Sequence, residues 1–512
     1  MPVKMNSQTL TNSHKLRTST TFSLARTCVS HTRILDCYRI QENQDLKGQT
    51  VAVVGLGVSG RAAARLAIAR GASVLAIDRN ENMAHLEHDP LFEKQNDLRT
   101  ILGHCDRELL ENADRVVVSP GVPLENYGIS SLLQSGRRVM SELDFAAEVL
   151  PHGIKILAVT GTNGKSTVTT FSGQMLSQLG VKAFVGGNLG NPLSEASIQC
   201  LTSSSVDHKF QVAVVEVSSY QMEIPYTYFC PSVGVVLNLT PDHLERHKTM
   251  EKYAAAKCRL FSHMNNKKLA VLPIGNKHLN EAFKDHVNKC NLAWIGDFPG
   301  VKIDLEAKIA YLQIPTTGVV TQLQLGAMKA MGTHNNHNAA VAAFSVLGLD
   351  VGIDPEGIST TLAALSAPPH RMQIVHRDSC GVKWVDDSKA TNVEATYAGL
   401  MGLREQKSVF LLGGLAKVLD TEGSNGFEKL VEPLKYHICV ITFGSSGTAI
   451  QKTLLASGIS IPCLRAKNME NAVNLARSIA RYGDAIVLSP DYSPNKQNFE
   501  EVKTYFPVTT SH

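Results

Sequence analysis

The chain has 512 residues, with 50 Lys or Arg against 46 Asp or Glu and a formal net charge of +4. A single domain rarely exceeds about 250 residues, so we expect two to four domains. An apolar fraction of 43% is enough for packed cores and argues against a largely disordered chain. No uninterrupted apolar run reaches about 18 residues, which argues against a transmembrane helix. Ten cysteines without a Cys-x-x-Cys pair indicate neither a disulfide framework nor a zinc site, and they favour a reducing compartment.

The net positive charge of the chain comes entirely from its N-terminal segment. Residues 1–35 contain five basic residues, twelve Ser or Thr and no acid, which leaves 45 basic against 46 acidic residues elsewhere, a net of −1. The basic residues are Lys4, Lys15, Arg17, Arg26 and Arg33. Such a start is typical of an organelle transit peptide, and its Ser/Thr content favours a plastid. We expect residues 1–45 to be a transit peptide, or alternatively a disordered tail without a role. The mature chain is then expected in the plastid stroma, with the cytoplasm as the alternative.

An alternation of strands and helices begins near Gly48. The apolar run Thr50–Val54 predicts a strand, Gly55–Gly60 a turn, and Arg61–Arg70 a helix. Further strands are expected at Val74–Ile77 and Val116–Val118. Strands that alternate with helices in this way predict a parallel sheet.

Two more series follow, one after Pro151 and one after the break at Ala367-Pro368-Pro369. The second series has predicted strands at Ile154–Thr160, Val212–Glu216 and Val233–Leu237 and predicted helices at Ser166–Leu179 and Asn335–Leu347. The third series has predicted strands at Val382–Val385, Ser408–Leu412, His437–Phe443 and Ala485–Leu488. Three α/β domains are therefore expected.

A glycine-rich loop lies between the first strand and the first helix of the second series, where a phosphate-binding loop belongs. Its residues are Gly161, Thr162, Asn163, Gly164, Lys165, Ser166 and Thr167. The strict Gly-x-x-x-x-Gly-Lys-[Ser/Thr] pattern is not met, because its first glycine falls on Val159. The Gly-Lys-Ser core still indicates a loop whose backbone N–H groups and helix N-terminus hold phosphate, with Lys165 at the β- and γ-phosphates. A purely structural glycine turn is the alternative.

Glu216 ends the predicted strand Val212–Glu216, so its carboxylate should emerge at the same sheet edge as the phosphate loop. Hard oxygen ligands suit Mg²⁺, which a nucleoside triphosphate requires. A glutamate paired structurally with a lysine is the alternative interpretation.

The first glycine loop leaves two interpretations open. Gly55-x-Gly57-x-x-Gly60 followed by Asp78 resembles a dinucleotide-binding fingerprint, which on its own suggests an NAD(P)-binding oxidoreductase. However, this loop by itself indicates only that a diphosphate or nucleotide binds near a helix N-terminus. In an oxidoreductase, moreover, the central phosphate loop would have no role.

Eleven blocks in family order, from about Val51 to about Leu488, resemble the Mur ligase family of peptidoglycan synthesis. They read GLGVSG, SPGV, VTGTNGKST, GGNLGNP, VVEVSSYQME, NLTPDHLERH, YAAAK, GTHNNHNAA, PPHRMQ, DDSKATN and LLGGLAK. DDSKATN and the short first domain favour the D-glutamate-adding members, and a DNPR-type block of diaminopimelate-adding members is not seen.

The resemblance implies a fold and a reaction. The expected domains are a Rossmann-like UDP-sugar domain over 46–142, a central P-loop ATPase domain with a mostly parallel sheet over 143–367, and a Rossmann-like amino-acid domain over 368–512. The terminal carboxylate of UDP-N-acetylmuramoyl-L-alanine is expected to attack the γ-phosphate of ATP and form an acyl phosphate. The amine of D-glutamate then forms the amide. Cations must offset the crowded negative charge.

The resemblance also implies roles for individual residues. ATP contacts are implied for Gly161 to Thr167, for Asn335 and Asn338, and for Arg371 and Asp387. Two Mg²⁺ ions are implied, with Ser166, Glu216, His243 and Lys257 as ligands and Lys257 carried as a carbamate. Lys165, His243 and Lys257 are the implied catalytic residues. The UDP-sugar contacts are Val58, Ser59, Asp78, Arg79, Ser119, Gly121 and Asn188, and the D-glutamate contacts are Lys389, Thr391 and Lys417. Taken without the resemblance, Lys257 is a surface helix lysine and His243 a loop histidine.

The C-terminal stretch departs from the family pattern. After Ser489-Pro490 the chain is shorter than expected and places Asp491 where a small residue is expected. A negative charge there would disfavour a dicarboxylate. A non-catalytic or altered-acceptor homologue is therefore the alternative function. The expected partners are small-molecule substrates of a monomer, without nucleic acid or membrane.

Overall fold

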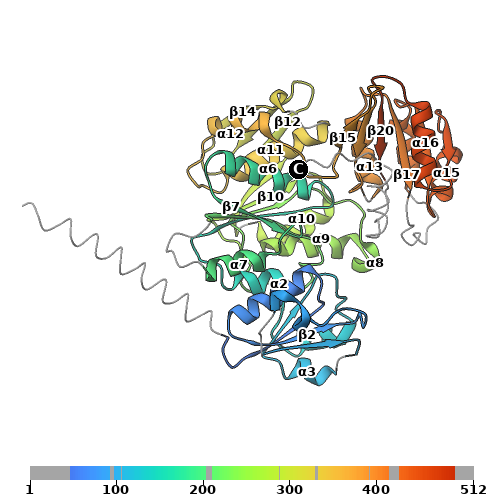
Figure 1. The fold of residues 1–512 in the computed structure, drawn as a ribbon. Coiled ribbons are helices and arrows are strands. Elements are labelled where there is room, and N and C mark those ends of the chain that lie inside the picture. The colour runs from blue at the N-terminus through green and yellow to red at the C-terminus, as the bar shows by residue number, and fades with distance from the viewer. Residues whose placement is uncertain are drawn as a thin grey trace, which may run out of the picture.

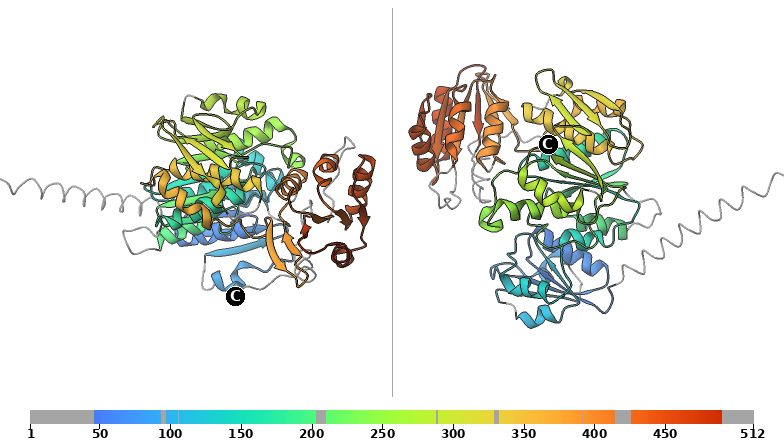
Figure 2. Two further views of the ribbon diagram at one scale, coloured as in Figure 1. Left: turned by 90° about the horizontal axis from the view of Figure 1, so that it is seen from above. Right: turned by 180° about the vertical axis from the view of Figure 1, so that it is seen from behind.

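The computed structural model describes residues 46–92, 97–104, 106–202, 210–287, 289–328, 332–390, 392–413 and 426–489. They form three α/β units, each built around its own sheet (Figure 1). The first unit lies at one end of the central unit, and the third lies beside the opposite half of the central unit (Figure 2).

The first sheet contains five parallel strands in the order β3-β2-β1-β4-β5. Its strands are β1 (Thr50–Val54), β2 (Ser73–Asp78), β3 (Leu98–Leu102), β4 (Arg115–Val118) and β5 (Val139–Ser141). Its helices are α2 (Val58–Ala69), α3 (Arg107–Glu111), α4 (Ile129–Gln134) and α5 (Glu142–Ala147). The valine-rich strands β1 and β4 are almost wholly buried, as expected of parallel strands covered on both faces.

The central sheet has nine strands in the order β14-β13-β12-β11-β10-β9-β6-β8-β7, parallel from β7 to β12. Its strands are β6 (Lys155–Thr160), β7 (Ala183–Gly187), β8 (Val212–Glu216), β9 (Val233–Val236), β10 (Leu269–Pro273), β11 (Asn291–Ile295), β12 (Gly300–Asp304), β13 (Ile309–Gln313) and β14 (Val320–Gln324). Its helices are α6 (Lys165–Gln178), α7 (Leu193–Leu201), α8 (Leu244–His247), α9 (Met250–Cys258), α10 (Lys277–Phe283), α11 (Thr333–Leu347) and α12 (Pro355–Thr361).

The third sheet has six strands in the order β15-β16-β20-β17-β18-β19, of which only the edge strand β15 is antiparallel. Its strands are β15 (Gln373–Arg377), β16 (Lys383–Asp386), β17 (Ser408–Gly413), β18 (Cys439–Phe443), β19 (Cys463–Arg465) and β20 (Ala485–Leu488). Its helices are α13 (Val393–Gly402), α14 (Val431–Leu434), α15 (Gly447–Ala456) and α16 (Met469–Ile479).

The predicted α/β class, with Rossmann-like outer units and a mostly parallel central sheet, is confirmed. The first helix begins three residues earlier than predicted, at Val58, so its first turn lies within the glycine loop. The sequence analysis did not predict strands β3, β5, β7, β10, β11, β12, β15 and β19. It also missed the antiparallel strands β13 and β14, whose half-exposed polar pattern resembles that of a loop. The predicted domain limits stay a prediction.

The first two units share one apolar core. Helices α2 and α5 of the first unit pack on α7 of the central unit, and the buried side chains of the three helices belong to a single cluster. The third unit has clusters of its own and approaches the central unit through α13, which contacts α11. A shared core holds the first two units as one body, whereas the contacts of the third unit with the central one include hydrogen bonds from Asn392 to Asn163 and Asp242.

Among the described residues, no helix combines the length and the apolar composition needed to cross a membrane.

Candidate functional site

The phosphate loop connects β6 to α6 with two glycines at positive φ. Gly161 has φ of 146° and Gly164, the N-cap of α6, has φ of 85°. A Cβ on Gly164 would lie 2.8 Å from Oδ1 of Asn338, so this position needs glycine for both conformation and space. The loop therefore brings its backbone close to the face of α11 that carries Asn338.

Asn238, which the sequence analysis did not single out, holds this loop in shape. Its Oδ1 accepts hydrogen bonds from the backbone N–H groups of Thr162 at 3.0 Å and Asn163 at 2.9 Å. Its Nδ2 donates to the carbonyl of Asn163 at 3.0 Å. Asn238 follows β9, the neighbour of β6, and opens the block NLTPDHLERH, which was the only signal for it in the sequence.

Arg371 and Lys389 of the third unit belong to the electrostatic surroundings of Lys165 and Glu216. Lys165 folds back and donates to the carbonyls of Gly161 at 3.0 Å and Thr162 at 2.8 Å, and burial lowers its pKa. Arg371 lies close enough to lower the pKa of Lys165 further, and its buried Nε has no hydrogen-bond partner among the described residues. Burial and then Arg371 also lower the pKa of Lys389. Such a cluster fits a polyanionic ligand.

The residues beside the loop fit a hard cation. Glu216 is 3% exposed at the end of β8, and its Oε1 accepts from Nδ2 of Asn188 at 2.8 Å. Its buried Oε2 has no hydrogen-bond partner among the described residues, so one lone-pair face is available to a ligand. Ser166 is buried in the first turn of α6. In the described part of the chain, no cluster of three or more His, Cys, Asp and Glu could hold a metal alone, so hydroxyl and phosphate oxygens would have to contribute.

Lys257 is not the surface lysine that its sequence context suggests. It lies on α9, is 1% exposed, and donates from Nζ to the carbonyl of Gly161 at 3.0 Å. Its Nζ lies 4.5 Å from the centre of the Tyr253 ring. Burial, and then the charge of Lys165, lower the pKa of Lys257 well below its usual value. Both effects disfavour the protonated form of this amine.

His243 sits between Asp242 and α8 with a left-handed backbone, φ 55°. Its Nδ1 lies 2.8 Å from the hydroxyl of Tyr220, and its Nε2 lies 3.5 Å from Oδ2 of Asp242. Tyr220 and Asp242 lie within the family-like blocks VVEVSSYQME and NLTPDHLERH but were not predicted as site residues. A sequence alone does not reveal which side chains contact a histidine ring.

Asn335 and Asn338 are both buried near the start of α11 and share a face at i, i+3 spacing, as predicted. Asn338 reaches Gly164 of the phosphate loop. The structure thus brings this helix face to the loop.

Arg371 is held by a strained connection between the central and third units. The residues on both sides have positive φ, 64° at His370 and 46° at Met372. His370 Nδ1 lies 2.6 Å from Oδ2 of Asp386, and the Met372 N–H donates to Oδ1 of Asp387 at 3.1 Å. Burial raises the pKa of Asp387 to about 7, which Arg371 opposes. Strain of this kind persists where surrounding contacts enforce it.

The predicted UDP-sugar contacts of the first unit gather at the carboxyl edge of its sheet. Asp78 ends β2 and accepts from the backbone N–H of Leu56 at 2.6 Å, which ties it to the first glycine loop. Ser119 follows β4 and donates to the carbonyl of Gly55 at 2.7 Å. Val58 and Ser59 begin α2, whereas Arg79 follows β2 and Gly121 lies after β4, and all four are exposed or half-buried. Asn188, by contrast, belongs to the central unit and contacts Glu216.

Of the predicted D-glutamate contacts, Lys389 is described, whereas Thr391 and Lys417 lie outside the described residues. The divergent stretch that includes Asp491 and the proposed transit peptide, residues 1–45, also lie outside them.

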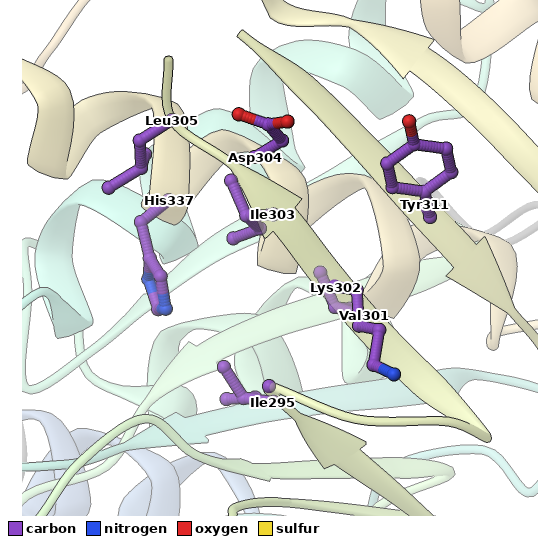
Figure 3. Close-up of a pocket in the computed structure, with 9 residues that line it drawn as sticks. Ile295, Val301, Lys302, Ile303, Asp304, Leu305, Tyr311 and His337 are labelled. Carbon is purple, nitrogen blue, oxygen red and sulfur yellow. The ribbon is translucent and has the colours of Figure 1, made fainter. Parts of the chain in front are cut away.

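A cavity of about 460 Å³ lies at the carboxyl end of β11 and along β12 (Figure 3). It is lined by Ile295, Gly296, Val301, Lys302, Ile303, Asp304, Leu305, Tyr311 and His337. None of the predicted site residues lines it, so this cavity and the predicted site are different features.

Each unit matches a domain of known families. Residues 49–141 match the N-terminal domain of MurD-like Mur ligases, residues 159–346 the Mur ligase middle domain, and residues 370–492 the glutamate ligase domain of Mur ligases.

Similar proteins cover almost the whole chain. The UDP-N-acetylmuramoylalanine–D-glutamate ligase of Desulfatibacillum aliphaticivorans is 31% identical over 90% of this chain and 96% of its own length. The ligase of the same name from Koribacter versatilis is 33% identical over 90% of this chain and 95% of its own. The structure of the MurF ligase from Thermotoga maritima in complex with ADP has a TM-score of 0.55 at 16% identity, covering 90% of this chain and 95% of that one. This last similarity supports the fold alone.

Proposed function

Since the chain belongs to the MurD-like branch of the Mur ligase family, we propose that it joins D-glutamate to UDP-N-acetylmuramoyl-L-alanine at the expense of ATP. The observation that carries the proposal is the loop Gly161–Thr167 itself, where Lys165 and Lys257 both donate to the carbonyl of Gly161. Arg371 of the third unit affects the pKa of Lys165, so binding of a polyanion would involve that unit as well. An oxidoreductase would leave this loop unexplained.

The reaction proceeds in two steps on this surface. A carboxylate is a poor electrophile, so the terminal carboxylate of the UDP-sugar substrate first attacks the γ-phosphate of ATP and becomes an acyl phosphate. Lys165 and Arg371 offset the negative charge that accumulates during this transfer. The amine of D-glutamate then attacks the acyl carbon, phosphate departs, and the amide forms. ADP and phosphate are the other products.

Ser166 and Glu216 are the proposed ligands of one Mg²⁺ ion, and His243 and a modified Lys257 of a second. The unpartnered Oε2 of Glu216 supports the first assignment. Mg²⁺ supplies charge neutralisation at the phosphates. The chain's own part is to hold these ligands in place, Glu216 through Asn188 and the loop through Asn238.

We further propose that Lys257 carries a carbamate. The neutral form of an amine is the nucleophile, and burial together with Lys165 favours that form. Its nitrogen attacks CO₂, a C–N bond forms, and one proton leaves. The product is an anion, which would relieve the repulsion between Lys257 and Lys165 and offer oxygen atoms to a metal.

The remaining contacts are assigned by position. The carboxyl edge of the first sheet, with Val58, Ser59, Asp78, Arg79, Ser119 and Gly121, is proposed to bind the UDP-sugar, together with Asn188. Asn335, Asn338 and Asp387 are proposed to contact the nucleoside of ATP. Lys389, Thr391 and Lys417 are proposed to hold the carboxylates of D-glutamate.

The test is ADP release from the purified protein with each substrate omitted in turn. Release that requires ATP, UDP-N-acetylmuramoyl-L-alanine and D-glutamate together supports the proposal. Release with another amino acid in place of D-glutamate would favour the altered-acceptor alternative. ATP binding without turnover for any acceptor would indicate a non-catalytic homologue.

We also propose that residues 1–45 direct the chain to the plastid stroma, where it acts as a monomer. A fusion of residues 1–50 to a fluorescent protein tests the plastid location, and fluorescence in the cytosol would contradict it. Sedimentation of the mature chain tests the oligomeric state.

A further inference from the structure

Tyr220, His243 and Glu245 form a hydrogen-bonded chain at the edge of the phosphate site. His243 Nδ1 lies 2.8 Å from the Tyr220 hydroxyl oxygen, and that oxygen lies 3.1 Å from Oε1 of Glu245. The Tyr220 and His243 rings are tilted, with centres 4.9 Å apart. The three side chains come from two segments, the loop after β8 and the start of α8.

The carboxylate of Glu245 favours one arrangement of the protons in this group. The side chain of Glu245 is 70% exposed and, as a carboxylate, only accepts hydrogen bonds. The Tyr220 hydroxyl donates to Oε1 of Glu245 at 3.1 Å, and the same Oε1 lies 3.4 Å from Nδ1 of His243, so Nδ1 faces two oxygen acceptors. The Tyr220 oxygen is then the acceptor for His243, whose Nδ1 must carry the hydrogen.

The opposite tautomer is disfavoured on the other side of the ring. It would place the hydrogen on Nε2, whose nearest carboxylate oxygen, Oδ2 of Asp242, lies 3.5 Å away. That distance is long for an N–H···O hydrogen bond, which is normally about 2.7–3.2 Å. With the hydrogen on Nδ1, Nε2 keeps its lone pair. This is the form of imidazole that binds a metal ion through Nε2.

The carboxylate nearest to Nε2 is linked to the phosphate loop. Asn392 of the third unit donates to Oδ2 of Asp242 at 3.5 Å and to Oδ1 of Asn163 in the loop at 3.3 Å. Nε2 therefore lies beside a carboxylate that shares a hydrogen-bond donor with the loop.

Tyr220 is itself held in position by the junction of the first two units. The guanidinium of Arg246 lies 5.0 Å from the centre of the Tyr220 ring. Arg246 pairs with Glu223 at 2.5 Å and donates to the carbonyl of Val122 in the first unit at 2.9 Å. Tyr220 thus has little freedom to turn its hydroxyl away from His243.

We propose that Tyr220 and Glu245 are positioning residues that select the Nδ1–H tautomer of His243 and so present Nε2 to a divalent cation. This inference rests on the proposed role of His243 as a metal ligand. A partner of this kind typically changes metal affinity by about 10–100-fold.

Two measurements without turnover test it. In protein labelled with ¹⁵N-histidine, long-range ¹H–¹⁵N spectra at pH 8 report the His243 tautomer, with the signal assigned by its loss in His243→Asn. Mn²⁺ titration followed by electron paramagnetic resonance, with a non-hydrolysable ATP analogue, reports cation affinity. We expect the Nδ1–H form in the wild type, a mixture of tautomers in Tyr220→Phe, and about tenfold weaker Mn²⁺ binding in that variant.

Tyr436→Phe is the matched control, because it removes a hydroxyl that pairs with Arg404 in the third unit, far from His243 in the chain. Glu245→Gln should also shift the tautomer, since its amide can donate to the Tyr220 oxygen. An Nε2–H form in the wild type, or an unchanged tautomer and Mn²⁺ affinity in Tyr220→Phe, would overturn the inference. If wild-type turnover requires D-glutamate but Tyr220→Phe changes neither the tautomer nor the Mn²⁺ affinity, the proposed function stands and the positioning role is rejected. If Tyr220→Phe changes both but turnover does not require D-glutamate, the positioning role stands and the proposed function is rejected.

Discussion

The Nζ atom of Lys257 donates a hydrogen bond of 3.0 Å to the carbonyl oxygen of Gly161, so helix α9 and the phosphate loop meet at a buried amine. This contact makes Lys257 part of the same surface as Lys165, whose charge lowers the pKa of Lys257. Two lysines so close together are stable only if one is neutral or modified, or if an anion lies between them.

Replacing Lys257 with alanine should lower turnover by about 100-fold or more, because a metal-binding anion would be lost. Formate or acetate should restore part of the activity by occupying the vacated space. The measurement is ADP release with and without added carboxylate. Lys252→Ala, an exposed lysine on the same helix, is the control and should behave as the wild type. Near-normal turnover of Lys257→Ala would rule out the carbamate.

Lys165→Ala should abolish turnover, by about 1,000-fold or more, since it removes positive charge at the transferred phosphate. The matched control is Lys155→Ala, which changes an exposed lysine at the opposite end of β6. Single-turnover measurements should place the loss in acyl-phosphate formation. A variant that keeps most of its activity would contradict the assignment of the phosphate loop.

Gly164→Ala should weaken ATP binding by about tenfold or more, because its Cβ would lie 2.8 Å from Oδ1 of Asn338 and the backbone φ is 85°. Gly180→Ala separates the two effects, since Gly180 has φ of 75° but no atom within 4 Å of an added Cβ. The control should cost only about 1–2 kcal/mol of stability and leave ATP affinity unchanged. Calorimetric titration with an ATP analogue measures both variants, and equal affinities would show that the close approach to α11 is unimportant.

Glu148→Ala should destabilise the junction of the first two units by about 3–5 kcal/mol. The Glu148 carboxylate is 9% exposed and pairs with Arg70 at 2.9 Å and Arg115 at 2.7 Å, and the Arg70 side chain is fully buried. Removing the carboxylate takes away the anion that lies 2.9 Å from this buried cation. Glu111→Ala, which breaks an exposed pair with Arg107, should cost less than about 1 kcal/mol. Thermal unfolding distinguishes the two, and similar melting temperatures would contradict the prediction.

Glu142→Gln should stabilise the protein at alkaline pH. Burial raises the pKa of Glu142 from 4.5 to about 7, so the folded chain holds a proton that the unfolded chain releases, and stability falls as pH rises between these values. Glutamine carries no such cost and can still accept the hydrogen bond from the Ser194 N–H. The variant's advantage should grow from pH 4.5 to pH 7, reach about 3 kcal/mol at most, and then stay constant. Equal differences in melting temperature at pH 5 and pH 8 would refute this.

Strand periodicity and glycine punctuation predicted the middle strands of each parallel sheet but not β3, β5, β7, β10, β11, β12 or β19. Val212–Glu216 and Ala485–Leu488 were predicted with the bounds that the structure shows, because buried parallel strands are short, continuous apolar runs. The antiparallel hairpin β13–β14 escaped prediction because half-exposed strands carry a weak pattern. The start of α2 was misplaced because glycines at a helix N-terminus look like a turn.

The sequence by itself determined the phosphate loop, its place between a strand and a helix, and the location of the positive charge in a segment that we propose is removed. These are local properties, since strand, loop and helix are adjacent in the chain. Only the tertiary structure decided that Lys257 is buried against Gly161, that Arg371 affects the pKa of both Lys165 and Lys389, and that Tyr220 and Glu245 lie beside Nδ1 of His243. The burial of a side chain, the electrostatic effect of neighbouring charges and the position of a shared proton all depend on groups that are far apart in sequence. These effects become strong only when folding removes the groups from water.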